Sequence, residues 1–191
     1  MLDAVLQRPD VDPNRIAAIG VSQAGYWIPR ALAFEHRLTA AVIDPGIIDV
    51  SAPWLSSLPD VMRSQLKHRQ HAAFDREMQL AELFSPATAA TLRFRAKPYG
   101  LNGGSRFALH ESVSAYRLGD EIQQITTPLL ITDPEEEQFW PGQSQQLYDR
   151  LPGPKQLLRF TSAEGANHHG EPLARALRDT RIFDWLDNHL A

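Results

Sequence analysis

The stretch RIAAIGVSQAG, residues 15–25, decides the fold of this chain. Its first part, residues 15–21, is an apolar run preceded by turn-forming residues, which is the pattern of a strand buried on both faces of a parallel sheet. Helical periodicity follows over residues 23–35, and a second apolar run at residues 38–43 predicts the next parallel strand. A strand, a helix and a parallel strand in such close succession predict α/β architecture.

Ser22 lies where the first predicted strand turns into the helix. A serine on such a sharp turn can act as a nucleophile, and it needs small residues two positions before and after it, here Gly20 and Ala24. The backbone N–H of Gln23, at the positive end of the helix, can face a developing oxyanion. The alternative is an ordinary tight turn with an incidental serine.

A serine nucleophile needs a base, and the base needs an orienting acid. On this architecture they follow along the chain in the order serine, acid, histidine. An acidic loop, DPEEE at residues 133–137, comes after a predicted strand at 128–132, and EGANHH at 164–169 comes after a predicted strand at 155–161. Each loop alone can be solvated surface, but catalytic groups gather at the carboxyl ends of parallel strands.

Two longer segments resemble the α/β-hydrolase superfamily. VDPNRIAAIGVSQAGYWIPRALAFEHRLTAAV, residues 11–42, is similar to its nucleophile region. TPLLITDPEEEQFWPGQSQQLYDRLPGPKQLLRFTSAEGANHHGEPLA, residues 127–174, is similar to its acid and histidine segments. The resemblance is strongest to the branch that holds FrsA-like esterases, 2,6-dihydroxypseudooxynicotine hydrolase and dipeptidyl-aminopeptidase-like proteins.

The resemblance implies a role for three residues. Ser22 matches the nucleophile, and the EGAxxH pattern of this branch places the base at His169, which leaves His168 dispensable. In the acid segment the family reads Gly-x-x-Asp before an apolar-Pro step, so Glu137 matches the acid. Glu136 and Asp133 are the fallback acids. Tyr26 and Trp27, on the helix after Ser22, are candidates for substrate binding.

The resemblance also implies that the chain corresponds to the C-terminal half of a hydrolase. The full fold has further strands before the nucleophile strand, and a loop among them supplies a second oxyanion donor. Strand 15–21 would then be an exposed apolar edge, open to a second copy of the chain or to a complementing N-terminal half.

The middle of the chain, residues 49–124, has helical periodicity punctuated by Pro53, Pro59, Pro86 and Pro98. We interpret it as a helical lid inserted into a core formed by residues 1–48 and 125–191. The core is expected to end in a helix at residues 171–190 with a set of apolar side chains, Leu173, Leu177, Ile182, Trp185 and Leu186.

Composition narrows the classes of partner and site. The net charge of 19 − 23 = −4 argues against nucleic acid as the partner, because phosphate binding needs a basic surface. The absence of cysteine excludes thiolate metal sites and a cysteine nucleophile. No membrane-spanning apolar run and no signal-peptide pattern occur, so we expect a cytoplasmic protein with no membrane partner.

The sequence therefore predicts a serine hydrolase that transfers the acyl group of a small carboxylic ester to water, with no metal or organic cofactor. A carbon–carbon bond hydrolase or an aminopeptidase of the same fold is one alternative. A non-catalytic fragment or interaction module without a complete oxyanion site is the other.

Overall fold

The computed structural model describes residues 2–101 and 103–191 and divides the chain into two compact units. One unit consists of Met1–Asp49 and Leu118–Ala191, and the other of Val50–Arg117. The second boundary falls seven positions before the one expected from sequence, because residues 118–124, including the 3-10 helix η2 (Asp120–Gln124), pack with the sheet unit.

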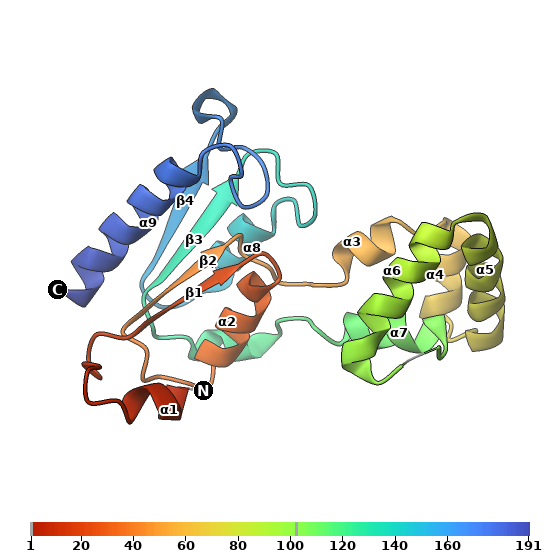
Figure 1. Ribbon diagram of the computed structural model, residues 1–191, viewed down its shortest axis with the longest axis horizontal. Coiled ribbons are helices and arrows are strands. Elements are labelled where there is room, and N and C mark those ends of the chain that lie inside the picture. The colour runs from red at the N-terminus through yellow and green to blue at the C-terminus, as the bar shows by residue number, and fades with distance from the viewer. Residues whose placement is uncertain (1, 102) are drawn as a thin grey trace. The chain divides into compact units, whose positions relative to one another are not determined.

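A four-stranded parallel sheet forms the core of the first unit (Figure 1). The strands lie in chain order and are β1 (Ala17–Val21), β2 (Ala40–Asp44), β3 (Leu129–Pro134) and β4 (Lys155–Phe160). Both central strands, β2 and β3, are buried along their whole length. The predicted parallel α/β architecture is thereby confirmed.

Helices cover both faces of this sheet (Figure 1). The C-terminal helix α9 (Arg175–Leu190) lies on one face, where Ile182, Trp185 and Leu186 pack against Ala40, Val42 and Leu130. On the other face α2 (Ala24–Leu32) packs against β1 and β2, and α8 (Gln143–Arg150) packs against β3 and β4. A short N-terminal helix, α1 (Leu2–Leu6), precedes β1.

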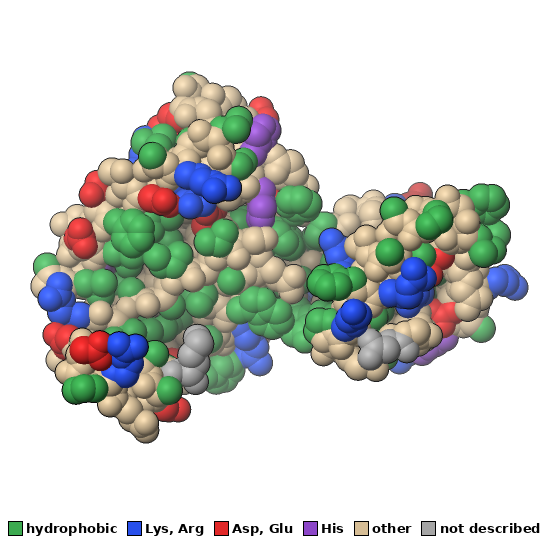
Figure 2. Space-filling view, in the orientation of Figure 1, with side chains coloured by type: hydrophobic (Ala, Val, Ile, Leu, Met, Phe, Trp, Pro, Cys, Tyr) green, Lys and Arg blue, Asp and Glu red, His purple; other side chains and the backbone are tan. Residues whose placement is uncertain are grey.

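The prediction that β1 is buried on both faces is wrong. β1 is an edge strand, and its Ile19 and Val21 side chains are 45% and 48% exposed. These two side chains are exposed to solvent because α9 packs on the central strands instead of on β1. Within the described part of the chain, β2 is also the only strand that pairs with β1. Apolar side chains are visible on this part of the surface (Figure 2).

The closing helix also begins later than predicted. α9 starts at Arg175 rather than at residue 171, and Leu173 is 82% exposed instead of packed in the core. Glu171 has a φ of +44°, which no right-handed helix accommodates, and Pro172 disfavours helical backbone at the residue before it.

The second unit is built from short helices, and the described residues form no strand in it. They are α3 (Ala52–Ser56), α4 (Asp60–Lys67), α5 (His71–Phe84), α6 (Pro86–Ala96), the 3-10 helix η1 (Lys97–Tyr99) and α7 (Arg106–Ser114). Phe74 and Phe107 meet edge to face in its core, with ring centres 5.8 Å apart. Beside them, Arg106 is paired with Glu82. None of the described helices of the chain is long and apolar enough to cross a membrane.

Candidate active site

Ser22 occupies a strained turn between β1 and α2. Its φ is +58°, in the left-handed region that non-glycine residues rarely adopt. Its backbone N–H donates a hydrogen bond to the carbonyl oxygen of Asp44, 2.6 Å away at the end of β2. Neighbouring structure therefore holds the unusual backbone in place, as is common at functional sites.

Two glycines allow the strand and the helix to come this close. A Cβ at Gly20 would lie 2.7 Å from the carbonyl oxygen of Ala24. A Cβ at Gly25 would lie only 1.8 Å from the carbonyl oxygen of Pro45, in the loop after β2. Ala24 is the small residue predicted at the second position after the serine, whereas the closest backbone approach is at Gly25.

The side chains of Ser22, His169 and Glu137 form one hydrogen-bonded row. Nε2 of His169 lies 2.9 Å from Oγ of Ser22, and Nδ1 lies 2.9 and 3.0 Å from the two carboxylate oxygens of Glu137. An ionised carboxylate only accepts, so Nδ1–H donates to Glu137 and Nε2 is left to accept from the serine hydroxyl. This tautomer is the one that a general base acting on Ser22 needs.

Glu137 remains ionised despite its burial. Burial of the side chain raises its pKa, but the hydrogen bond from His169 and those from the backbone N–H groups of Phe139 and Trp140 outweigh this effect. The net result is a pKa below the ordinary value for glutamate. A negative charge is thus kept against Nδ1, where it can stabilise an imidazolium.

The two fallback acids and the neighbouring histidine have other partners. Asp133 pairs with Arg159 at 3.0 Å, and Glu136 accepts a hydrogen bond from Asn167 at 2.8 Å. His168 has a half-exposed side chain that contacts Gln138 at 2.5 Å. Of the three acids considered from sequence, Glu137 is the one that contacts His169.

Hydrogen bonds hold the loop that carries His169 at its start and at His169 itself. At its start, the backbone N–H and hydroxyl of Thr161 both donate to the carboxylate of Glu164, which closes the 3-10 helix η3 (Ser162–Glu164) back onto the residue before it. Farther along, the His169 N–H donates to the side-chain oxygen of Gln138 at 3.2 Å.

Aromatic rings enclose the histidine. Phe139 meets the His169 ring edge to face, with the ring centres 5.0 Å apart, and the centre of the Trp140 ring lies 5.6 Å from that of His169. The sequence does not predict the contacts of Gln138, Phe139 and Trp140 with His169, and the position of these residues directly after Glu137 is the one signal for them.

The remaining predicted site residues lie on α2 or at its start. Gln23 is the N-cap residue of this helix, and among the described residues its backbone N–H has no hydrogen-bond acceptor. Tyr26 is buried and meets the Trp27 ring edge to face at 5.1 Å, while Trp27 is 41% exposed. A substrate-binding role for these two aromatic residues stays a prediction.

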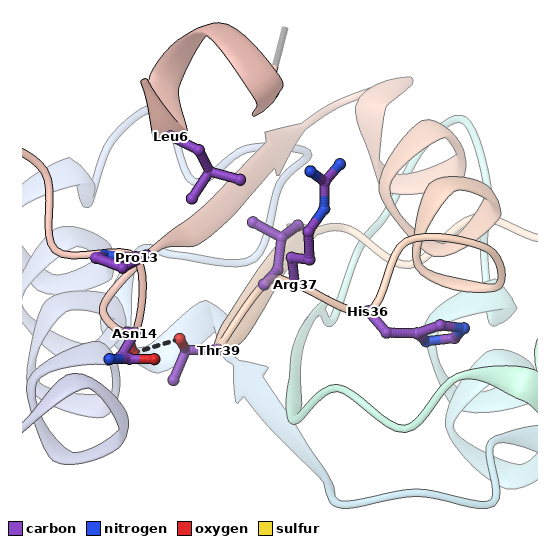
Figure 3. Close-up of a pocket in the computed structure, with 7 residues that line it drawn as sticks. Leu6, Pro13, Asn14, His36, Arg37 and Thr39 are labelled. Carbon is purple, nitrogen blue, oxygen red and sulfur yellow. Dashed lines mark hydrogen bonds between the residues drawn. The ribbon is translucent and has the colours of Figure 1, made fainter. Parts of the chain in front are cut away.

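A hollow of about 480 Å³ lies elsewhere in the sheet unit (Figure 3). The residues that line this hollow come before β1 and β2 in the chain, so the hollow lies toward the amino ends of these strands. Ser22, in contrast, follows the carboxyl end of β1. The lining residues are Leu6, Pro13, Asn14, His36, Arg37, Leu38 and Thr39. No described residues gather as three or more metal-ligating side chains.

Comparisons with known proteins identify the fold. No protein-family model and no curated protein matches the sequence. Among solved structures, the chain is similar to the alpha/beta hydrolase GrgF from Penicillium sp. sh18, with a TM-score of 0.62, 20% identity, and coverage of 99% of this chain and 70% of that one.

Two further structures show the same likeness. The 2,6-dihydroxy-pseudo-oxynicotine hydrolase gives a TM-score of 0.64 at 15% identity, covering 100% of this chain and 44% of that one. Acetyl xylan esterase 1 from Thermoanaerobacterium sp. JW/SL YS485 gives a TM-score of 0.53 at 16% identity, and the match covers 97% of this chain and 49% of that one. The chain spans less than half the length of these two proteins. By its parallel sheet, the sharp turn at Ser22 and these likenesses, the chain has the fold of the α/β hydrolases.

Proposed function

We propose that this protein is a serine hydrolase that works by acyl transfer to water. The observation that carries the proposal is the hydrogen-bonded row from Ser22 through His169 to Glu137. Its three members come from the loops after β1, β4 and β3, as the order of a serine hydrolase on this fold requires.

The first half of the reaction forms an acyl-enzyme. Oγ of Ser22 attacks the carbonyl carbon of the substrate while Nε2 of His169 takes the hydroxyl proton. Glu137 stabilises the imidazolium that results. The tetrahedral intermediate then collapses, and His169 gives its proton to the departing alcohol.

In the second half, water takes the place of the alcohol. His169 removes a proton from the water, whose oxygen attacks the acyl carbon, and Ser22 Oγ leaves with the proton returned by His169. In both halves, the Gln23 backbone N–H is the proposed donor to the oxyanion. The site of that N–H at the start of α2 supports this role, because helix N-termini favour negative charge.

A small carboxylic ester is the proposed substrate. Structural likeness to an acetyl xylan esterase supports this class. Likeness to the 2,6-dihydroxy-pseudo-oxynicotine hydrolase and to an acylaminoacyl peptidase favours two alternatives, a carbon–carbon bond beside a ketone and an amide. All three substrates present a carbonyl carbon to the same nucleophile.

The test is covalent labelling with a fluorophosphonate, which reacts with activated serines whatever their substrate. We expect labelling of the wild-type protein, none of Ser22→Ala, and full labelling of Ser57→Ala, which changes an exposed serine of the helical unit. Wild-type protein that is folded by circular dichroism yet unlabelled would overturn the proposal and favour a non-catalytic interaction module.

A further inference from the structure

Two acidic side chains, those of Asp44 and Glu171, interact with each other in the protein interior beside the proposed site. Asp44 ends β2 and Glu171 follows His169 by two positions, and both residues have no exposed surface. Charged side chains are almost never fully buried without a partner, because an ion loses its hydration there. A pair of buried acids therefore needs a physical explanation.

Their hydrogen bonding is incomplete if both are carboxylates. Oδ1 of Asp44 accepts from the Thr132 hydroxyl at 2.8 Å. Among the described residues, Oδ2 of Asp44 and both side-chain oxygens of Glu171 have no hydrogen-bond partner. Two carboxylates cannot bond each other because both are acceptors, whereas one added proton makes a donor.

We infer that Glu171 is a neutral carboxylic acid that donates a hydrogen bond to the Asp44 carboxylate and thereby positions His169. The inference rests on the proposed function only in its last part, the effect on His169. The shared proton would satisfy buried oxygens of both side chains and leave one negative charge between them.

The pair joins the two loops that carry the proposed base and nucleophile. The Asp44 carbonyl oxygen accepts the Ser22 backbone N–H, and the Glu171 backbone N–H donates to the carbonyl oxygen of His168 at 2.9 Å. A bond between the two side chains thus spans from the Ser22 turn to the segment around His169. Glu171 holds a strained φ of +44°, which needs such an anchor.

Arg178 on α9 balances the remaining charge. Its Nη1 lies 3.8 Å from Oδ2 of Asp44, too long for a hydrogen bond, and donates to the carbonyl oxygen of Gly170 at 3.0 Å. The same guanidinium also pairs with Asp179. Because the Asp179 side chain is half-exposed and solvated, the guanidinium can still offset the charge of the buried Asp44 carboxylate, which a buried site tolerates better than an unpaired ion.

The electrostatics agree with a neutral Glu171. Burial, then the charge of Asp44 and the hydrogen bond that a protonated Glu171 makes to it, raise the pKa of Glu171 to about 9, with a smaller contribution from Glu137. Arg178 opposes the rise without cancelling it. The charged groups facing Glu171 are therefore Asp44 from β2, Glu137 from the loop after β3, and Arg178 from α9.

Loss of this proton would free the loop around His169. Two adjacent carboxylates repel, so the link between the Ser22 turn and His169 would open above about pH 9. Glu171→Gln keeps an N–H donor toward Asp44 and cannot ionise, so it is expected to preserve the link. Glu171→Ala removes the donor altogether.

The first measurement is independent of activity. Protein labelled with carbon-13 at glutamate side-chain carboxyl groups is titrated by NMR from pH 5 to pH 10, for wild type, Glu171→Gln and the charge control Asp187→Asn. We expect one resonance to stay at the protonated position at pH 7, to be absent from Glu171→Gln and to persist in Asp187→Asn. Carboxylate positions for every glutamate at pH 7 would overturn the inference.

The second measurement is the rate of fluorophosphonate labelling of Ser22 against pH. We expect the wild-type rate to fall above about pH 9, Glu171→Gln to keep its rate there, and Glu171→Ala to be slower at every pH by about 10²-fold. Equal alkaline falls in wild type and Glu171→Gln would overturn the positioning role.

The two measurements separate the inference from the proposed function. Absence of labelling in every variant would remove the hydrolase proposal, and with it the effect on His169, while the NMR titration would still decide the protonation of Glu171. A Glu171→Ala protein that fails to fold leaves the comparison of wild type with Glu171→Gln intact.

Discussion

The backbone N–H of Ser22 and the carbonyl oxygen of Asp44 are joined by a 2.6 Å hydrogen bond that links the end of β1 to the end of β2. This bond fixes the turn that carries the proposed nucleophile to the end of the neighbouring strand. Because Ser22 is held in this way, its reactivity is expected to depend on the side chains that face it, and substitutions there give sharp tests.

The two adjacent histidines are expected to behave differently. His169→Ala should abolish labelling and ester hydrolysis as completely as Ser22→Ala, because a serine and its base act as one unit. His168→Ala should keep most of the activity, since its half-exposed ring contacts Gln138 rather than Ser22. The check is a p-nitrophenyl acetate assay, and the reverse order of losses would place the base at His168.

Glu137→Gln should lower turnover strongly. An amide in place of the carboxylate offers an N–H toward Nδ1 of His169 and favours the wrong tautomer, which costs about 10⁴-fold in the best-studied serine hydrolase. Glu136→Gln and Asp133→Asn are matched controls, because those carboxylates pair with Asn167 and Arg159. A larger loss in either control would identify it as the orienting acid.

Stability is expected to fall as the pH rises from about 4.5 to about 9. Glu171 keeps its proton up to about pH 9 in the folded chain but loses it near 4.5 when unfolded. The folded state therefore binds the extra proton across this window, and each pH unit lowers the free energy of unfolding by up to about 1.4 kcal/mol.

The stability prediction is checked by thermal unfolding at pH 5, 7 and 9. Glu171→Gln cannot take part in this exchange, so its melting temperature should decline less with pH than that of wild type. Equal declines in the two proteins would contradict a proton on buried Glu171.

β1 is expected to mediate association. Within the described residues, one edge of β1 pairs with no strand and its Ile19 and Val21 side chains are exposed, and such edges pair readily with another strand. Ile19→Lys should reduce the association measured by light scattering, since edge lysines oppose strand pairing. A wild-type protein that is monodisperse and monomeric at every concentration would rule this out.

The helical unit is expected to act as a lid and to be cleaved first. Limited proteolysis followed by mass spectrometry should give early cuts within residues 50–117 and a longer-lived sheet unit. A stably folded fragment of residues 50–117, expressed alone, would instead indicate an independent domain.

The proximity of the proposed site residues could be predicted, because the carboxyl ends of parallel strands lie at one edge of the sheet. Ser22, Glu137 and His169 follow β1, β3 and β4, and the structure brings their side chains together as the sequence suggested. Their catalytic roles stay a prediction. The residues alone could not separate Glu137 from Glu136, because the direction of each side chain depends on the turn in which Glu137 N–H donates to Pro134 at 3.2 Å.

Other features could not be predicted because they depend on distant contacts. The apolar composition of β1 suits a central strand as well as an edge strand, so its residues alone predicted burial on both faces, and only the resemblance to the hydrolase family indicated the exposed edge seen among the described residues. The sequence predicts a helix that starts at Glu171, because the burial of an acidic residue leaves no pattern in the sequence. Its proximity to Pro172 was the one local hint that the helix begins later.

The close approach of Gly25 to Pro45 restricts how this turn can vary among related sequences. A side chain at position 25 would collide with backbone, whereas position 24 already carries an alanine. Searches for relatives that insist on glycine at the second position after the serine would miss chains built in this way. A pattern with glycine two residues before the serine and three after it describes the steric requirement of this turn and would retrieve them.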